Sequence, residues 1–325
     1  MNRSAPVRFD AFMEHALHDP ERGYYARRIR GIGRHGDFAT APALLPGFSH
    51  AIARWAAAAL DATGCRDLIE IGPGDGTLAA AVMRLLPWRL RLRTRLRFVE
   101  CSEPLAAMQR ARFRQRATWH RHPLESLDAC GGAAVIFSNE LVDAFPVRCF
   151  RLGSDGWCEL WLRWAPPAPP EEVWQPAEPL PHSSSFQQPH TLGQRIEVHE
   201  SYRQWLAAWL PAWHAGRLLT IDYGAPAAAL YHRRPHGTLR GYLMHQRLDG
   251  AACYLNPGRA DLTADVNFTD LQDWAAPWAR TLRLASLREF VMAAGLAPAA
   301  PPAPWLADPG PGDAFLALDQ EPLLP

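Results

Sequence analysis

The sequence predicts an α/β fold with a mostly parallel, Rossmann-like sheet, and two observations carry this prediction. Apolar runs with the length of buried strands alternate with helical patterns between residues 67 and 138. A cluster of three glycines directly follows the first run, which is typical of a strand that turns into a helix beside a ligand. The expected core strands cover 67–71, 95–100, 133–138 and 217–222, and the expected helices between them cover 77–86 and 103–115.

The segments around this core are predicted from their periodicity and composition. We place an N-terminal extension at 1–60 and the core at 61–325. The extension is expected to contain an amphipathic helix over 9–19, a long loop rich in Gly, Arg and Tyr over 20–46, and an Ala-rich helix over 47–60. No internal repeats are found.

Two long segments interrupt the second half of the core. An insertion at about 147–213 should hold a hairpin of strands 147–152 and 157–164, an exposed linker over 165–190, and a helix from about Ser201 whose Trp205 and Trp209 face the core. A long loop punctuated by Gly and Pro is expected over 224–268. Helices over 269–276 and 286–294 and a strand over 314–318 should complete the chain.

Composition narrows the class of protein. The formal net charge is +1 over 325 residues, which argues against a general nucleic-acid or membrane-surface binder. The chain contains no lysine, so Schiff-base chemistry and a P-loop lysine are excluded. Its 6 cysteines form no C-x-x-C pair, which favours a reducing compartment. With no apolar run of membrane-spanning length and no apolar region after Met1, we expect a cytoplasmic protein without a signal peptide.

The glycine cluster after the first core strand is the most informative motif. Gly72, Gly74 and Gly76 follow Glu70, and Thr77 stands where the dinucleotide fingerprint would have its third glycine. Glycine is needed where the backbone turns sharply against a ligand. This tighter spacing, preceded by an acid, suits a methionine-type moiety better than a pyrophosphate.

An acid at the end of the second core strand supports the same ligand. Glu100 ends the run that begins at Leu96, about 20 to 25 residues past the glycines, where a carboxylate accepts hydrogen bonds from a ribose diol. Taken alone, Glu100 is equally compatible with a solvated strand end. Together with the glycine loop, it predicts S-adenosyl-L-methionine (SAM) as the cofactor, with S-adenosyl-L-homocysteine as the product.

The third cluster of polar residues follows the strand at 133–138. Asn139 and Glu140 come directly after that strand, and Asp143 shares a face with Glu140 if the segment is helical. Two close carboxylates would hold a guanidinium and accept its proton during methylation, so these three residues are the candidate catalytic group. The alternative is an acidic helix N-terminus without a catalytic role.

Beyond these clusters, the chain resembles the MidA-type family of SAM-dependent methyltransferases from about Phe9 to Gly295. The resemblance rests on seven motifs in order: D-P-x-x-G-Y-Y from Asp19, G-D-F-x-T-x-P from Gly36, E-I-G-P-G-x-G-T-L from Glu70, N-E-L-x-D-A-x-P-V from Asn139, D-Y-G from Asp222, G-T-L-R-x-Y from Gly237 and N-P-G-x-x-D-L-T from Asn256.

The resemblance implies a class I SAM-methyltransferase core that transfers a methyl group to a protein arginine, on a respiratory complex I subunit or a similar assembly partner. It implies that SAM is held by the acid and glycine motif and by Glu100, and that the two long loops close over the cleft. Gly36, Asp37 and Phe38 would lie near the cofactor, with a loop-capping role as the alternative for Asp37. Asp222 and Tyr223 would line the substrate side.

The sequence departs from the family pattern at several positions. Ala43, His50, Asp265 and Asn267 replace residues of different charge or titration behaviour, which puts the acceptor in doubt. An assembly chaperone with little or no activity and a small-molecule methyltransferase are therefore the alternatives, and a dehydrogenase is disfavoured by the glycine spacing. His232, His236 and His245 lack the spacing of metal ligands, so no metal is expected. A homodimer is left open.

Overall fold

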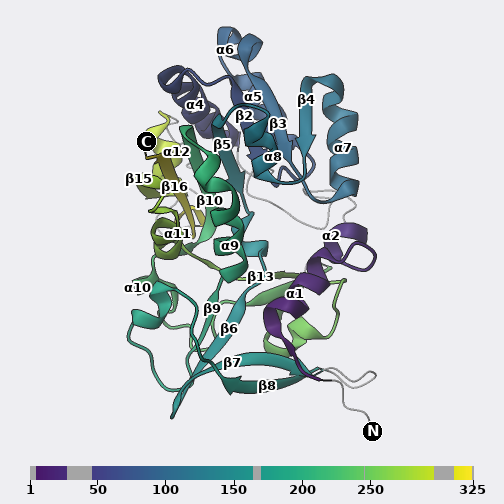
Figure 1. Ribbon diagram of the computed structural model, residues 1–325, viewed down its shortest axis with the longest axis vertical. Coiled ribbons are helices and arrows are strands. Elements are labelled where there is room, and N and C mark those ends of the chain that lie inside the picture. The colour runs from purple at the N-terminus through teal and green to yellow at the C-terminus, as the bar shows by residue number, and fades with distance from the viewer. Residues whose placement is uncertain (1–4, 28–45, 164–169, 245, 296–310, 324–325) are drawn as a thin grey trace. The chain divides into compact units, whose positions relative to one another are not determined.

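The computed structural model describes residues 5–27, 46–163, 170–244, 246–295 and 311–323. The chain folds into two compact units, which are described separately below (Figure 1). The core unit comprises 30–141, 206–223 and 272–325, and the insert unit comprises 1–29, 142–205 and 224–271. Within the described residues, no helix is both long and apolar enough to cross a membrane.

The core unit is built on a sheet whose strand order is β15-β16-β10-β5-β2-β3-β4. Strands β10, β5, β2, β3 and β4 run parallel, whereas β16 is antiparallel to both β10 and β15. The strands are β2 (Asp67–Ile71), β3 (Arg95–Val99), β4 (Ala117–His120), β5 (Ala133–Asn139), β10 (Ala215–Ala225), β15 (Ala279–Ser286) and β16 (Phe315–Pro322).

The strand order reverses at the centre of this sheet. After β2 the chain adds β3 and β4 on one side, and then returns to add β5 and β10 on the other. Leu68 of β2 therefore pairs with Leu96 on one side and Val135 on the other. Ligands of open α/β sheets bind at the carboxyl ends of the strands at such a reversal, because the connecting segments diverge there.

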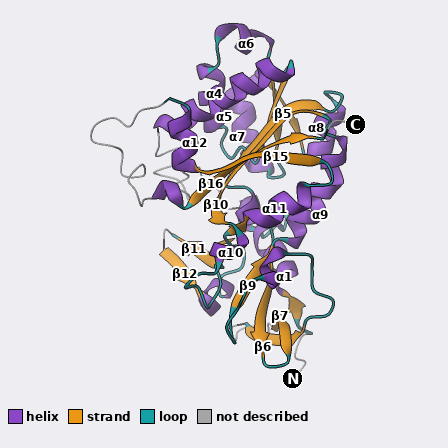
Figure 2. Ribbon diagram, turned by 90° about the vertical axis from the view of Figure 1, so that its left-hand side faces the viewer, coloured by secondary structure: helices purple, strands orange, loops and turns teal. Residues whose placement is uncertain are grey.

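Helices pack on the sheet through a large apolar cluster. α4 (Pro46–Thr63), α5 (Thr77–Leu85) and α12 (Leu287–Ala293) contribute to it together with sheet residues such as Phe137 and Leu219, both fully buried (Figure 2). Burial of each such side chain stabilises the fold by about 1.5–3 kcal/mol. The unit also contains α6 (Trp88–Arg93), α7 (Glu103–Phe113) and α8 (Pro123–Asp128).

The insert unit contains two antiparallel sheets. The larger has the order β1-β7-β6-β9 with β8 also paired to β7, and the smaller has the order β12-β11-β13. Their strands are β1 (Val7–Arg8), β6 (Arg148–Gly153), β7 (Gly156–Arg163), β8 (Glu171–Pro176), β9 (Arg195–Val198), β11 (Arg240–Leu243), β12 (Gln246–Asp249) and β13 (Asp261–Thr263). The helices α1 (Phe9–His18), α2 (Tyr24–Arg27) and α10 (Ala227–Leu230) also belong to this unit.

Three elements contain residues at the boundaries of the units. α9 (Glu200–Trp209), α11 (Phe268–Ala275) and β10 each have residues in both units. β14 (Val266–Asn267) pairs in parallel with the last two residues of β10, which belong to the insert unit. Trp209 is buried, as expected, and Trp205 packs on Phe145 at a ring distance of 5.2 Å.

The predicted α/β class and mostly parallel sheet are confirmed, with the core strands within about three residues of their expected bounds. Two predicted segments are wrong. The linker expected at 165–190 contains β8, and Ser184 and Ser185 beyond it are buried. The loop expected at 224–268 contains the whole β12-β11-β13 sheet. Their strands are short and interrupted by Gly and Pro, so periodicity did not reveal them.

Candidate functional site

The glycine loop lies between β2 and α5, at the reversal of strand order. β2 is buried along its whole length, and Gly72, Gly74 and Gly76 follow it with φ of 66°, 57° and 77°. These left-handed conformations are disfavoured for residues with a Cβ, so the three glycines make the turn possible. Leu141 is packed against Gly72, because a Cβ built there would stand 2.8 Å from Leu141 Cδ1.

The loop is surrounded by carboxylates, which bears on the ligand it can take. Asp75 Oδ1 accepts a hydrogen bond from the backbone N–H of Thr77 (2.9 Å), so a side chain of the protein already occupies the start of α5. Electrostatic repulsion from Asp75 and Glu100 contributes to raising the pKa of Glu70. Asp75 also pairs with Arg112 at 3.2 Å, so the set offers hydrogen-bond acceptors more than net negative charge, which favours a ligand with hydroxyl and ammonium donors.

Glu100 is joined to the glycine loop by a residue that the sequence did not reveal. Gln109 of α7 is fully buried, and its Nε2 donates both to Gly74 O (2.7 Å) and to Glu100 Oε2 (3.1 Å). Gln109 Oε1 accepts from Trp119 Nε1 at 3.0 Å, which fixes the orientation of the amide. Glu100 Oε1 accepts from the backbone N–H of Ser102 (2.8 Å). A helical position that is inward-facing yet polar is the only sequence signal that could have identified Gln109.

Burial shifts both acids of this site towards the neutral form. Desolvation raises the pKa of Glu70 well above its usual range, and one of its oxygens, Oε2, is buried without a hydrogen-bond partner among the described residues. Desolvation also raises the pKa of Glu100 to about 7, opposed by the hydrogen bonds from Ser102 and Gln109. A ligand that donates hydrogen bonds to these oxygens would recover part of that cost.

The residues expected to act on the substrate begin at the carboxyl end of β5. Asn139 is buried, and its Nδ2 donates to Glu140 Oε1 at 3.1 Å, while its Oδ1 has no partner within the described part of the chain. Glu140 has a φ of 50°, an uncommon conformation for this residue type that costs about 1–3 kcal/mol. The backbone therefore bends sharply at the strand end, where an amide and a carboxylate stand together.

Asp222 of β10 supports this turn. Its carboxylate is fully buried, and Oδ2 accepts from the backbone N–H of Leu141 (3.2 Å) while Oδ1 accepts from that of Tyr223 (2.9 Å). The backbone N–H of Glu140 also donates to Ile221 O at 3.0 Å. Asp222 thus joins the ends of β5 and β10. The ring of Tyr223 packs edge-on against Phe315 at 5.4 Å.

Asp143 belongs to the insert unit rather than to the core unit. It lies in a single 3-10 turn, Val142–Ala144, so no α-helix begins at this point. Asp143 Oδ2 accepts from Thr263 Oγ1 at 2.7 Å, and its backbone carbonyl accepts from the N–H of Ala264 at 3.2 Å. Burial and the charges of Asp261 and Asp143 raise the pKa of Tyr25, whose hydroxyl donates to Asp261 at 3.3 Å.

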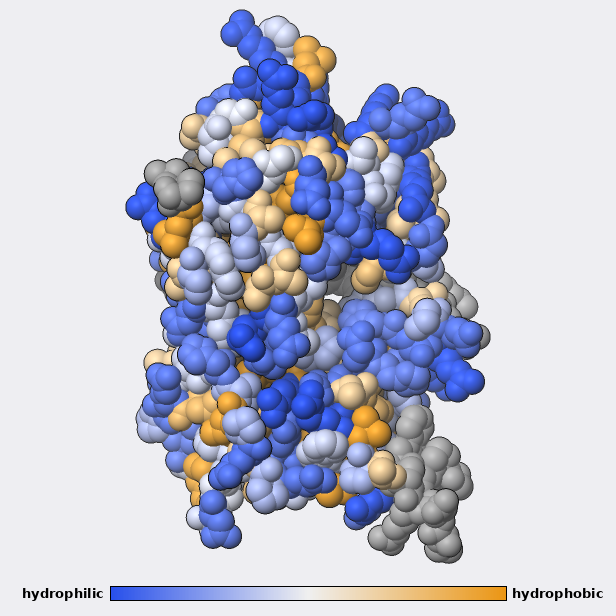
Figure 3. All heavy atoms as spheres, viewed as in Figure 1, coloured by the Kyte–Doolittle hydropathy of each residue, from blue (hydrophilic) through white to orange (hydrophobic). Residues whose placement is uncertain are grey.

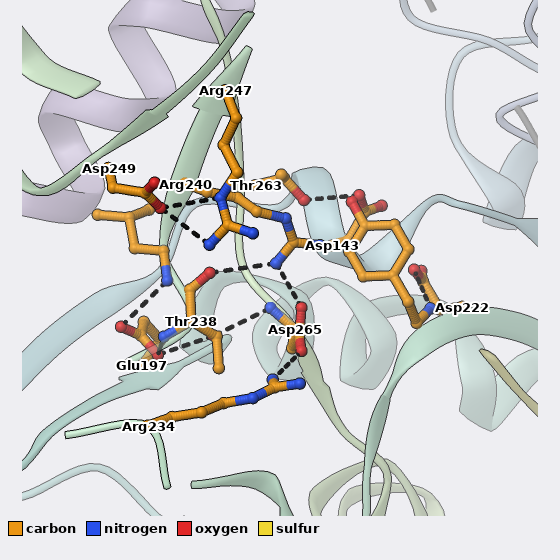
Figure 4. A network of polar contacts seen from close by, with 12 residues as sticks. Asp143, Glu197, Asp222, Arg234, Thr238, Arg240, Arg247, Asp249, Thr263 and Asp265 are labelled. Atoms are coloured by element: carbon orange, nitrogen blue, oxygen red, sulfur yellow. Dashed lines mark hydrogen bonds and ion pairs between the residues drawn. The ribbon is translucent and has the colours of Figure 1, made fainter. Parts of the chain in front are cut away.

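A network of polar contacts holds the segment around the G-T-L-R-x-Y motif (Figure 4). Asp265 pairs with Arg234 and, at 2.5 Å, with Arg240. The buried Glu197 carboxylate accepts from the backbone N–H and the hydroxyl of Thr238, both at 2.9 Å. Asp265, one of the departures from the family pattern, is therefore part of the framework of the insert unit.

The remaining candidate residues are either outside the described part of the chain or on its surface. Gly36, Asp37, Phe38 and Ala43 lie outside the described residues. His50 is an exposed residue of α4. Among the residues that the structure describes, no group of three or more His, Cys, Asp and Glu side chains is arranged to hold a metal ion.

The fold and the core-unit site together define a class of protein. A parallel sheet reverses its order at a glycine turn, and buried acids with an unpaired oxygen surround that turn in the described part of the core unit. The acceptor oxygens match the hydroxyls and ammonium of SAM, and Asp75 occupies the helix start at which a dinucleotide phosphate would bind. The class is that of α/β enzymes that bind a nucleoside cofactor carrying positive charge.

Comparison with known proteins specifies the family. The model of a family described as putative S-adenosyl-L-methionine-dependent methyltransferases matches residues 51–283, and this chain belongs to that family. It is 26% identical to the mitochondrial protein arginine methyltransferase NDUFAF7 of Rattus norvegicus, over 90% of this chain and 72% of that protein. It is 28% identical to the Drosophila melanogaster homologue, over 82% of this chain and 65% of that protein.

A solved structure has a similar fold over most of this chain. A COG1565 superfamily member and likely methyl transferase from Burkholderia thailandensis, bound to S-adenosyl-homocysteine, superposes with a TM-score of 0.84. It is 26% identical, and the match covers 97% of this chain and 88% of that chain. The class I methyltransferase fold and the dependence on SAM, both expected from the sequence, are confirmed by these comparisons.

Proposed function

We propose that this protein transfers a methyl group from SAM to the guanidino group of an arginine in a partner protein. The observation that carries the proposal is the amide and carboxylate of Asn139 and Glu140, held together at the carboxyl end of β5 beside the glycine loop. The relatives in Rattus norvegicus and Drosophila melanogaster are named protein arginine methyltransferases, which supports the same acceptor.

The cofactor residues would divide the recognition of SAM between them. Glu100 would accept hydrogen bonds from the ribose hydroxyls, with Gln109 holding its carboxylate in place. Glu70 and the glycines Gly72, Gly74 and Gly76 would line the methionine end, where the turn brings backbone close to the ligand. SAM supplies an electrophilic methyl group on its sulfonium. The protein positions the cofactor and the acceptor and supplies carboxylates beside them.

Glu140 would act on the acceptor. A carboxylate binds a guanidinium through charge-assisted hydrogen bonds and orients one nitrogen, and positioning of this kind supplies much of the acceleration of a bimolecular transfer. As the nitrogen is alkylated it becomes more acidic, and the Glu140 carboxylate would accept its proton. We assign Asn139, through its unpaired Oδ1, and Asp143 to the same catalytic group, and Asp222 and Tyr223 to the substrate side.

The proposal is tested by methylation of candidate proteins with SAM labelled in the methyl group, followed by mass spectrometry of the modified residue. The wild type should transfer the labelled methyl group to arginine, and Glu140→Gln should lower kcat by at least about 100-fold. Its Kd for SAM should change less than about twofold, since Glu140 is not assigned to the cofactor.

The matched control is Glu103→Gln, which removes an exposed carboxylate on α7 and should leave kcat unchanged. Transfer to no arginine by a wild type that still binds SAM would overturn the proposal. Candidate acceptors come first from respiratory complex I subunits, as the family resemblance implies. We place the reaction in a reducing compartment, the cytoplasm, where the free thiols of all 6 cysteines would persist.

A further inference from the structure

A basic and apolar surface lies on the core unit at α6, away from every residue assigned to the cofactor. Trp88 is 61% exposed and Leu92 is 79% exposed, and five arginines lie in the same stretch of chain: Arg84, Arg89, Arg91, Arg93 and Arg95. We call these seven residues the α6 patch. It immediately precedes β3, so it lies at the amino ends of the strands, whereas the cofactor residues lie at the carboxyl ends (Figure 1).

The helix presents its apolar residues outwards because of their spacing. Leu90 is 3% exposed and anchors α6 on the core. Trp88 and Leu92 are each two positions from Leu90, about 200° around the helix, and they are four positions apart, so they form one outward ridge. In Figure 3 apolar and strongly hydrophilic spheres adjoin at this end of the unit.

Arginines border the ridge on both sides. Arg89 and Arg93 lie on one flank, and Arg91 lies on the other, where its Nη1 donates to Arg84 O at 3.2 Å. The guanidinium carbon of Arg89 stands 5.3 Å from the ring centre of Trp88. The helix therefore carries an apolar edge with cationic groups on either side.

The charge of the patch is only partly balanced by the protein. Arg93 pairs with Asp61 at 2.8 Å, and Arg95 pairs with Asp67 at 2.8 Å. No ion pair with a carboxylate within the described residues is found for Arg84, Arg89 or Arg91. The whole chain has a formal net charge of only +1, so this excess is local.

We propose that the α6 patch docks the protein on an anionic lipid surface. Trp and Leu on the outer side of a short helix, flanked by arginines, are the residues that insert at the boundary between headgroups and acyl chains, while arginine side chains reach the lipid phosphates. A projecting ridge needs no complementary groove in its partner, which favours a bilayer over a folded protein. This inference does not depend on which acceptor is methylated. Docking through the α6 patch would leave the carboxyl ends of the strands, where the cofactor residues lie, uncovered by the lipid.

Vesicle binding by the full chain tests the proposal, at about 0.15 M salt so that weak charge attraction is screened. Binding to phosphatidylcholine vesicles with about one third phosphatidylserine should be at least tenfold tighter than to phosphatidylcholine alone. Trp88→Ser/Leu92→Ser and Arg89→Gln/Arg91→Gln should each lose at least tenfold in affinity. Quenching by brominated lipids should fall in Trp88→Phe relative to the wild type.

The matched control is Leu192→Ser/Arg247→Gln, which changes an equally exposed leucine and an exposed arginine of the insert unit and should bind as the wild type does. Unchanged melting temperatures and binding of S-adenosyl-homocysteine would show that every variant is folded. Equal binding to both vesicles, equal binding by the patch variants, or tighter binding to polyglutamate or an oligonucleotide than to vesicles would each overturn the proposal.

Discussion

Glu100 shows how burial of a single residue couples the cofactor site to pH. Its pKa is raised to about 7 by desolvation, against about 4.5 in an unfolded chain. The folded protein therefore binds this proton more tightly than the unfolded protein does. The stabilisation that comes from this more tightly bound proton is present in full below pH 4.5, and it is lost as the pH rises through about 7. Without cofactor, the folded state is then destabilised by up to about 3 kcal/mol.

Replacement of Glu100 should separate stability from cofactor binding. Glu100→Gln removes the ionisation, so we expect it to raise the melting temperature at pH 8 and to change it little at pH 5. In the wild type the affinity for SAM should rise about tenfold between pH 6 and pH 8, because the ionised carboxylate is the stronger acceptor for the ribose hydroxyls. Calorimetry at both pH values checks this; a pH-independent wild type would contradict it.

Gln109 is uncharged, and its role at this site is to hold the Glu100 carboxylate in place by a hydrogen bond. Gln109→Leu would remove the donor to both Gly74 O and Glu100 Oε2 and leave Trp119 Nε1 unpaired. We expect the Kd for SAM to rise about tenfold and the unfolding free energy to fall by about 1–3 kcal/mol. Gln204→Leu, which changes an exposed glutamine on α9, is the control and should leave the Kd unchanged.

The departures from the family pattern at Asp265 and Asn267 have a structural explanation. Asn267 Nδ2 donates to Ser184 Oγ and Ser185 Oγ, both at 3.0 Å, and Asp265 pairs with Arg234 and Arg240. Both side chains are buried and engaged within the insert unit. These contacts give both residues a structural role, which weakens one motive for the chaperone hypothesis.

The two ion pairs of Asp265 can be tested by replacing each of its arginine partners in turn. The side chain of Arg240 is 13% exposed and that of Arg234 is 49% exposed. Arg240→Gln leaves a buried carboxylate with only its exposed partner, so we expect a loss of about 3 kcal/mol in unfolding free energy. Arg234→Gln should cost less than about 1 kcal/mol. Urea denaturation measures both, and equal losses would argue against the assigned burial.

At the scale of elements, strands were predictable where a mostly apolar run led directly into a motif residue. β2 and β3 are central, so both of their faces are buried and the run is unmistakable. β15 was missed because it carries Arg280 and Arg283 on an edge of the sheet, and β4 because it has only 4 residues. Such strands depend on tertiary pairing that a local pattern does not encode.

The candidate site was predictable where its residues belong to local motifs, and not where they meet through long-range contacts. The acid and glycine motif and Glu100 are local signals at strand ends, and each lies in the core unit as expected. Gln109 and the support that Asp222 gives to Leu141 arise from residues 35 and 81 positions apart in the chain. Contacts over such separations follow from the topology of the sheet, so no single segment could reveal them.

Gly72 tests the link between the glycine loop and the turn after β5. Gly72→Ala would force a Cβ into the left-handed region and towards Leu141 Cδ1. Gly131→Ala is the matched control, since Gly131 has a φ of 63° and a Cβ added there would meet no described atom within 4 Å. Both should lose about 1–2 kcal/mol of stability from backbone strain. Only Gly72→Ala should also weaken SAM binding, by about tenfold or more.

For the whole molecule, the important fact is that neither unit is a continuous segment of chain. Each is assembled from three segments, and β10, which belongs to the core sheet, follows the large insertion. A chain cut after residue 141 would lack β10, β15 and β16, and with them Asp222. The two units therefore cannot be studied by simple truncation, and their responses to the cofactor have to be measured in the intact protein.

Hydrogen exchange with and without S-adenosyl-homocysteine provides that measurement. Because every described residue assigned to the cofactor lies in the core unit, the ligand should slow exchange in the loop 72–76, in 100–109 and in the turn 139–141. β8 in the insert unit pairs only with β7 among the described strands, and it should exchange at the same rate in both states. Glu100→Gln should reduce the protection in all three core segments together, since they share one ligand. Protection confined to β8 and its neighbours, with none at 72–76, would place the ligand elsewhere and remove the basis of the assigned site.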